Sequence, residues 1–160
     1  MAADNNKIDA LTGPLWQRLG GELTAETMSR LSADETTLLA YSILREELLE
    51  GGFVQLIQNG YGPFIFLNPF AKAMRLWGLK DFSKWLYDAR AVYEQTRSVL
   101  EQPTETDEEF MALYEQHPEW DAYDDWFVEA EPEITEKICL HWFNSLNKNK
   151  EKSPLCGDKK

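Results

Sequence analysis

The chain divides into segments whose apolar residues recur every three or four positions, and most of these segments end at a glycine or a proline. This spacing is the period of an α-helix, and no convincing stretch shows the period of two that marks a strand. The clearest segment begins at Ser32, which forms a capping box with Glu35, and ends at Gly51 and Gly52. The pattern predicts an all-α protein.

The same periodicity predicts the other helices. One covers residues 22–31, and another starts at Phe53 and ends at the turn of Asn59 and Gly60. The next two segments are residues 64–77, which end at Gly78, and residues 81–100, which Asp81 caps. Three more follow: a helix that begins with Thr106 and Glu109, a helix over residues 119–130, and a last helix with Pro132 at its first position. We expect a single compact domain of about seven helices, residues 1–147, and a flexible polar tail, residues 148–160.

Length and composition fit one folded domain. The chain has 160 residues, of which 12% are aromatic, so we expect it to fold and to carry its net charge of -12 on its surface. No apolar run approaches the roughly 18 residues of a membrane span, and the first residues do not resemble a signal peptide. Cys139 on a helix face and Cys156 in the tail make no disulfide framework. We therefore expect a cytoplasmic protein with reduced thiols.

The excess negative charge lies in one block. Residues 101–136 hold 14 acids and no Lys or Arg, whereas residues 1–100 hold 12 acids and 10 bases. On a helical wheel Trp120, Tyr123, Trp126, Phe127 and Ala130 share one arc, and Asp121, Asp124, Asp125 and Glu129 share the opposite arc. In the last helix the inward arc holds Ile134, Ile138, Cys139, Trp142, Phe143 and Leu146. The block is therefore expected to display its acids to solvent.

Two interpretations of this block stay open, a solvated surface that aids solubility and a dedicated surface for a basic partner. Like charges four residues apart each disfavour a helix by roughly 0.2–0.5 kcal/mol, and interleaved Lys would remove that cost. Duplex DNA carries one charge per about 1.7 Å, whereas four carboxylates over the roughly 12 Å from Asp121 to Glu129 give about one per 3 Å. Imitating DNA would need a second row from residues 101–115, or a dimer mate.

Other kinds of site are disfavoured. His117, His141 and Cys139 lack the spacing of zinc ligands, and the acids lack the glycine of a calcium loop. No phosphate-binding loop or nucleophile motif is present, so we expect no metal, no cofactor and no enzyme activity. Gln55 and Asn59 form an uncharged polar pair after the glycine bend, and we interpret them as tying that bend through backbone groups.

One stretch resembles a known family. The residues Glu46-Glu47-Leu48-Leu49-Glu50-Gly51-Gly52-Phe53-Val54-Gln55, followed by Asn59-Gly60, are similar to the signature of small acidic all-helical bacterial proteins. This family includes a DNA-mimic protein of about 19 kilodaltons. The resemblance covers about residues 38–147. It implies a non-catalytic homodimer that occupies the DNA-binding face of a helix-turn-helix transcription factor and competes with operator DNA.

The resemblance and the acidic block together predict a DNA mimic that binds a protein and neither nucleic acid nor membrane. We expect seven carboxylates to take phosphate positions, those of Asp107, Glu108, Glu115, Asp121, Asp124, Asp125 and Glu129. The first alternative is a helical interaction module for another basic partner, such as a histone-like protein or a toxin. The second is an enzyme that uses Gln55, Asn59 and nearby carboxylates.

Overall fold

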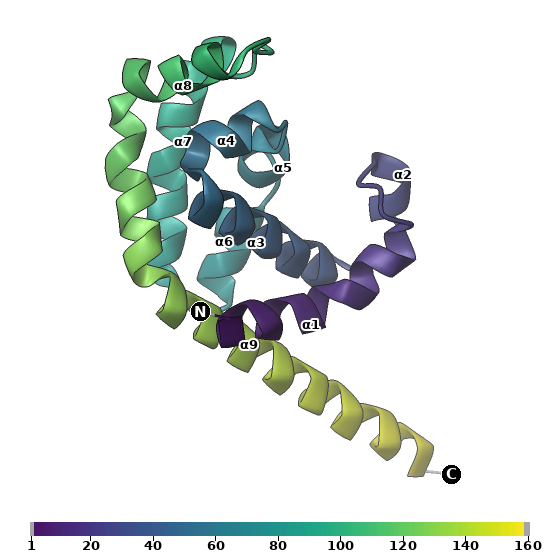
Figure 1. Cartoon of the computed structure of the whole chain (residues 1–160). Coiled ribbons are helices and arrows are strands. Elements are labelled where there is room, and N and C mark those ends of the chain that lie inside the picture. The colour runs from purple at the N-terminus through teal and green to yellow at the C-terminus, as the bar shows by residue number, and fades with distance from the viewer. Residues whose placement is uncertain (1, 159–160) are drawn as a thin grey trace.

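Helix α3, Ala33–Glu50, runs through the middle of the molecule with the other helices around it (Figure 1). The computed structural model describes residues 2–158, with side chains described for residues 7–148. The predicted capping box opens α3, because the Ser32 hydroxyl accepts from the Glu35 N–H at 3.1 Å and Glu35 accepts from the Ser32 N–H at 2.9 Å. Four of its side chains are fully buried, those of Leu38, Leu39, Tyr41 and Leu44.

Residues 2–158 form nine α-helices and one short 3₁₀ helix, and no strand. The helices around α3 are α1 Ala2–Leu19, α2 Ala25–Met28, α4 Gly52–Gln58, α5 Gly62–Phe66, α6 Phe70–Leu76, α7 Lys80–Leu100, α8 Asp107–Gln116 and α9 Asp121–Asp158, with the 3₁₀ helix at Pro118–Trp120. The all-α prediction is confirmed, and the helix count is higher than the seven expected. None of the helices within this range is long and apolar enough to cross a membrane.

The first helix was not predicted, and the second is shorter than expected. α1 contains Gly13 and Pro14, which are poor helix formers, yet Ile8, Leu15 and Leu19 are buried where it packs on α3 and α9. Tertiary packing therefore overrides weak local propensity in α1. The predicted helix at residues 22–31 is reduced to the four residues of α2.

Two predicted boundaries in the middle of the chain are wrong. The single helix expected at residues 64–77 is divided into α5 and α6 at Pro69, which has no N–H to continue the ladder. The Asn68 amide then caps α5 by donating to the Phe64 carbonyl at 2.8 Å. Asp81 does not cap α7, because the helix begins one residue earlier and Asp81 lies inside its first turn.

The expected boundary between residues 130 and 132 is also wrong, since α9 continues through Pro132. Proline at this position cannot donate to the carbonyl of Val128, and the side chains of both residues are exposed. Figure 1 shows the axis of α9 changing direction part-way, as a proline inside a helix usually causes. The first half of α9 lies on the body of the molecule and the second half projects from it.

This projection corrects the predicted burial of the last helix. Ile134, Ile138 and Cys139 are buried as expected, but Phe143 is 52% exposed and Leu146 is 41% exposed because the body does not reach them. The backbone of α9 is helical to Asp158, within the stretch for which we predicted a flexible tail, residues 148–160. Side chains after residue 148 lie outside the described residues, so the tail stays a prediction.

The core joins α3 to α7 and α9 through aromatic rings. Phe53, the first side chain of α4, is fully buried, and its ring centroid lies 4.5 Å from that of Trp120, 5.4 Å from Trp85 and 5.6 Å from Phe66. Such contacts add about 0.5–1.5 kcal/mol each beyond the area they bury. The bend between α3 and α4 is therefore packed against Trp120, the last residue of the 3₁₀ helix that precedes α9.

Candidate functional site

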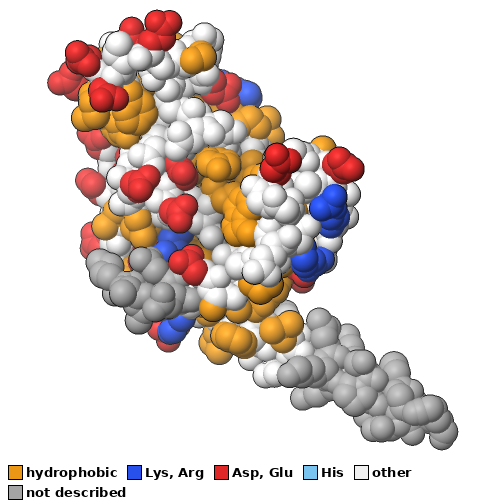
Figure 2. Space-filling view, turned by 45° about the vertical axis from the view of Figure 1, so that its right-hand side comes forward, with side chains coloured by type: hydrophobic (Ala, Val, Ile, Leu, Met, Phe, Trp, Pro, Cys, Tyr) orange, Lys and Arg blue, Asp and Glu red, His pale blue; other side chains and the backbone are white. Residues whose placement is uncertain are grey.

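The acidic block forms one continuous structural unit, which we call the acidic arm and define as residues 101–136. It contains the turn after α7, all of α8, the 3₁₀ helix and the first half of α9. Side chains of Asp and Glu crowd the end of the molecule where α8 lies (Figure 2). Figure 1 shows α8 crossing the top of the molecule while α9 descends along its side, so α8 extends the acidic surface and does not run beside α9.

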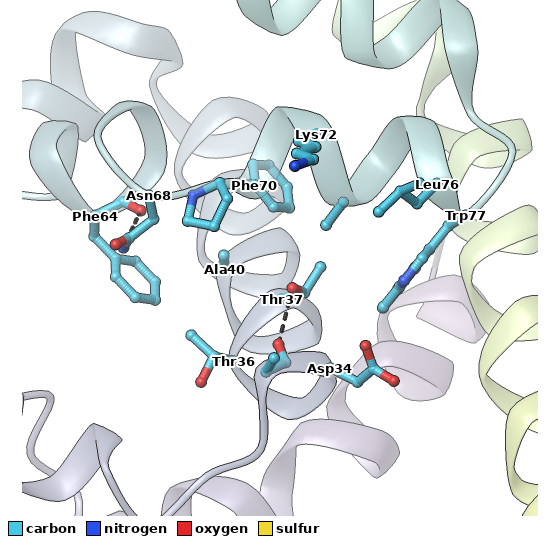
Figure 3. A pocket seen from close by; sticks show the side chains of 13 residues that line it. Asp34, Thr36, Thr37, Ala40, Phe64, Asn68, Phe70, Lys72, Leu76 and Trp77 are labelled. Carbon is cyan, nitrogen blue, oxygen red and sulfur yellow. Dashed lines mark hydrogen bonds between the residues drawn. The ribbon is translucent and has the colours of Figure 1, made fainter.

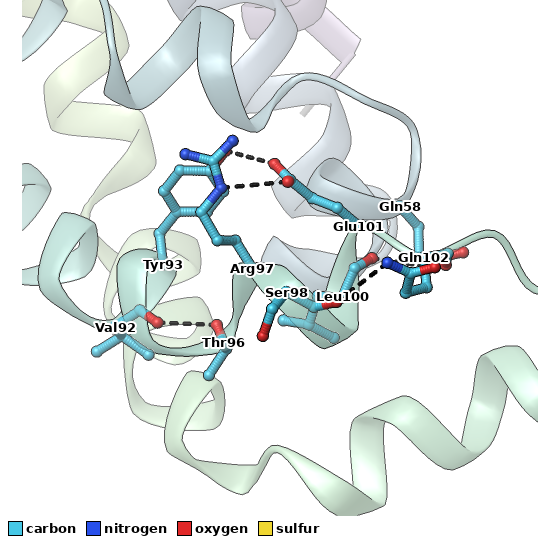
Figure 4. Close-up of polar contacts among 9 residues, drawn as sticks. All are labelled: Gln58, Val92, Tyr93, Thr96, Arg97, Ser98, Leu100, Glu101 and Gln102. Carbon is cyan, nitrogen blue, oxygen red and sulfur yellow. Dashed lines mark hydrogen bonds and ion pairs between the residues drawn. The ribbon is translucent and has the colours of Figure 1, made fainter.

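The arm leaves α7 through a turn that α4 holds in place (Figure 4). The Gln58 amide donates to the carbonyls of Leu100 and Gln102 at 2.6 and 2.7 Å, and accepts from the Thr104 hydroxyl at 3.0 Å. Glu101 accepts from the Tyr93 hydroxyl at 2.5 Å and pairs with Arg97 at 3.2 Å. Glu101 is thus engaged inside the fold.

The arm returns to the body at the bend between α3 and α4. The Tyr114 hydroxyl on α8 donates to the Gly51 carbonyl at 2.7 Å. Asp124 on α9 accepts from the Phe53 N–H at 3.0 Å. Burial raises the pKa of Asp124 to about 7, and the negative charges of Asp121 and Asp125 also raise it. The hydrogen bond from the Phe53 N–H acts in the opposite direction and lowers this pKa. The wheel placed Asp124 on the solvent-facing arc, and that placement is wrong.

The region that a family model matches includes this bend and the whole arm. A model described as "DMP19-like protein" matches residues 29–148. The chain belongs to the DMP19-like family. One relative is the DNA mimic protein DMP19 of Neisseria meningitidis, which is 39% identical over 121 residues, covering 73% of this chain and 73% of the relative. The matched region starts after α1 and α2, so the family resemblance resides in α3 to α9.

In this DMP19-like chain, six of the seven predicted site residues are exposed. Asp107, Glu108 and Glu115 lie on α8, and Asp121, Asp125 and Glu129 lie on α9. The three acids on α9 are spaced one helical turn apart, about 6 Å along the axis. The structure therefore brings these three into one row, and it sets the α8 acids on a separate helix at the end of that row.

Not every acid of the arm is available to a partner. Glu131 is 2% exposed and pairs with Arg45 at 2.7 Å, and Glu133 pairs with Lys137 at 3.1 Å. Glu101 and Asp124 are engaged as described above. The other ten are exposed, and the structure pairs none of them with a Lys or Arg among residues 7–148: Glu105, Asp107, Glu108, Glu109, Glu115, Glu119, Asp121, Asp125, Glu129 and Glu136.

Some exposed acids were not among the predicted site residues. Glu136 lies eleven residues after Asp125, which is about three helical turns, so both side chains project from the same side of α9. The sequence pattern places Glu136 on the solvent side of a separate helix that starts at Pro132, so it was not counted in one row with Asp125. Without Asp124, three carboxylates remain over the roughly 12 Å from Asp121 to Glu129, or about one per 4 Å. The row is sparser than predicted.

Gln55 and Asn59 have a structural role, although through different partners than expected. Asn59 donates to the Glu47 carboxylate at 2.8 Å, and Gln55 donates to Glu47 at 3.2 Å and to Glu50 at 2.7 Å. These bonds tie α4 to α3 through carboxylates, where we expected backbone groups. In the part of the chain that the structure describes, no three His, Cys, Asp or Glu residues are grouped so as to hold a metal ion.

A pocket of about 400 Å³ lies between α3 and α6, away from the acidic arm. Figure 3 shows Phe64, Phe70 and Trp77 along its apolar wall, with Asp34 and Lys72 also lining it. No residue of the arm lines this pocket, and neither do Gln55 and Asn59. The pocket is therefore separate from both candidate sites that the sequence suggested.

Proposed function

We propose that this protein is an acidic DNA mimic that binds the DNA-binding surface of a helix-turn-helix transcription factor and competitively blocks it from operator DNA. The observation that carries the proposal is the acidic arm, which exposes ten carboxylates and contains no Lys or Arg. A relative that is 39% identical to this chain over 121 residues is named a DNA mimic protein. Because its target would act on chromosomal DNA, we place the protein in the cytoplasm.

The exposed carboxylates would occupy the positions of phosphates. Asp107, Glu108 and Glu115 on α8 and Asp121, Asp125 and Glu129 on α9 would pair with Lys and Arg of the target. The same charges would repel nucleic acid, so the protein would not bind DNA itself. Catalysis plays no part in this mechanism, since blocking requires only occupancy of the DNA-binding surface.

We further propose a homodimer, because one row on α9 is sparser than DNA and α8 does not lie beside it. The second half of α9 offers exposed apolar side chains, with Leu140 60% exposed and Phe143 52% exposed. Pairing two copies through these residues would remove apolar surface from water and supply a second acidic row from the mate.

The test begins with affinity capture from the producing cells at low salt, followed by titration of the captured protein with its labelled operator. The wild type should displace the operator, less so as salt rises. A variant with Asp121→Asn, Asp125→Asn and Glu129→Gln should compete about ten- to a hundred-fold less well, since each exposed ion pair contributes up to about 1 kcal/mol.

The matched control is Glu22→Gln, Glu26→Gln and Asp88→Asn, which neutralises three exposed acids outside the arm. It changes the net charge by the same amount and should compete like the wild type. Equal losses in the two variants would mean that total charge, and not the arm, decides binding. Failure of the wild type to displace operator at low salt would contradict the proposal itself.

A second candidate function is a module that binds another basic protein, such as a histone-like protein or a toxin. The observation that favours it is the charge spacing on α9, about one carboxylate per 4 Å against about one per 1.7 Å in duplex DNA. A basic partner that is captured without losing its DNA would support this alternative. An enzyme is the weakest hypothesis, because the amides of Gln55 and Asn59 are bonded to Glu47.

A further inference from the structure

The start of α4 lacks a cap of its own. The helix follows α3 without a linker, and its N-cap residue, Gly51, has no side chain to accept from the first N–H groups. Unsatisfied N–H groups at a helix start need an acceptor from elsewhere. The acceptor here is Asp124, 71 residues away in the sequence, which bonds the Phe53 N–H at 3.0 Å.

The carboxylate fits because the residue beside it is glycine. Gly52 has a φ of +81°, in the region that L side chains rarely adopt, and a Cβ at this position would overlap the Asp124 carboxylate. The glycine therefore does two things at once, turning the chain from α3 into α4 and leaving room for a group from α9. The backbone at Gly52 and the Asp124 carboxylate are therefore complementary in shape.

Two further contacts from the arm meet the same bend. Tyr114 on α8 donates to the Gly51 carbonyl at 2.7 Å, and the Trp120 ring lies 4.5 Å from the Phe53 ring. Three side chains from the acidic arm thus contact Gly51 and Phe53, the two residues on either side of Gly52. Any movement of the bend would move the row of carboxylates on α9 with it.

We propose that Asp124 positions the acidic arm by capping α4 at the glycine bend and does not itself imitate a phosphate. The expected effect of Asp124 on partner binding rests on the proposed function. Its effect on the position of the acidic arm is independent of that function. The neighbouring Asp121 and Asp125 are the phosphate-imitating members of this turn. They are exposed, while the Asp124 carboxylate is turned toward the body.

The groups that face Asp124 agree with this role. On α9 the charged neighbours are Asp121 and Asp125, and across the bend lies Tyr114 from α8. Burial raises the pKa of Tyr114, and the charges of Asp124 and of Glu47 from α3 raise it further. No base faces Asp124 among these groups, so the Phe53 N–H is the contact that favours its ionised form.

The first test measures amide hydrogen exchange at Phe53 and along residues 120–130 in three variants of the protein. Asp124→Ala removes the acceptor and should speed exchange at Phe53 about ten-fold, which corresponds to a lost cap. Asp124→Asn keeps an acceptor oxygen of the same shape and should restore wild-type exchange. Asp125→Ala, the matched control one residue away, should leave exchange unchanged.

Several outcomes decide the proposal. Failure of Asp124→Ala to fold, with Asp124→Asn and Asp125→Ala folded, supports the capping role. Unchanged exchange in Asp124→Ala would overturn it, and so would an Asp124→Asn variant as impaired as Asp124→Ala, because the charge would then matter more than the hydrogen bond.

The second test repeats the operator titration, using the captured DNA-binding protein and its own DNA as the probe. Asp124→Asn should compete within two-fold of the wild type and with the same salt dependence, whereas Asp125→Asn should compete less well and with a smaller salt dependence. Equal effects of the two substitutions would make Asp124 a phosphate mimic and overturn the inference. A wild type that never competes would remove the proposed function but leave the exchange result intact.

Discussion

The buried ion pair between Arg45 and Glu131 offers a sharp test of the packing of α9 on α3. Both side chains are nearly inaccessible, at 6% and 3% exposed, and their Nε and Oε2 atoms lie 2.7 Å apart. Glu131 also accepts from the Thr135 hydroxyl at 2.7 Å, and Thr135 shares a 2.8 Å bond with the Tyr41 hydroxyl. Removing one partner of such a pair leaves an uncompensated buried charge.

Glu131→Gln should therefore lower the free energy of unfolding by about 3–5 kcal/mol. For a chain of 160 residues the unfolding entropy is about 0.34 kcal/mol/K, so Tm should fall by about 9–15 °C. The matched control is Glu133→Gln, two residues along the same helix, where the pair with Lys137 is exposed. Its effect should be below about 0.5 kcal/mol.

The assay is urea unfolding followed by tryptophan fluorescence and circular dichroism, with thermal unfolding as a second measure. Replacing both partners, with Arg45→Met and Glu131→Leu, should recover most of the loss, because apolar side chains of similar size need no charge partner. Equal small effects of Glu131→Gln and Glu133→Gln would refute the reasoning, since the pair would then be hydrated in solution.

Two other predictions concern pH and assembly. Burial raises the pKa of Asp124 to about 7, whereas the unfolded chain releases this proton above about pH 4. Between these two pH values the folded protein holds a proton that the unfolded chain has lost, so the free energy of unfolding falls as the pH rises from about 4 to about 7. Between pH 5 and pH 8 the wild type should lose about 1–2.6 kcal/mol more than Asp124→Asn in urea unfolding; identical pH profiles would contradict the burial of this carboxylate. Leu140→Ser with Phe143→Ser should convert the proposed dimer to monomer in analytical ultracentrifugation, with wild-type helix content, whereas a Val128→Ser control on the exposed side of the first half of α9 should stay dimeric.

The helices that the sequence predicted well are those whose ends carry local signals. The Ser32 capping box and the glycine pair at residues 51 and 52 bound α3 as expected, because both depend on residues within one turn of the helix end. α1 was missed because its stability comes from packing on α3 and α9. α9 was divided in error because a proline at an exposed position only bends a helix that is otherwise well packed.

The candidate site was predicted in part for the same reason. A helical wheel separates the polar side of α9 from its apolar side, and it identified Asp121, Asp125 and Glu129 as exposed acids. It could not foresee that Asp124 would meet Phe53 or that Glu131 would meet Arg45, because those contacts join residues 71 and 86 positions apart. Contacts between residues this far apart in the sequence cannot be predicted from the periodicity of a single helix.

The division of the arm's acids into engaged and exposed groups bears on how such proteins are sought in genomes. A search that ranks open reading frames by acidic content would credit this arm with 14 charges, although only ten of its carboxylates are exposed and unpaired with a Lys or Arg among residues 7–148. A better score would count only acids that share a helical side with other acids and have no base one turn away, which removes Glu101 and Glu133. Asp124 and Glu131 are recognised only from their tertiary contacts. Such a score would rank short, ordered acidic helices above long acidic tails of greater total charge.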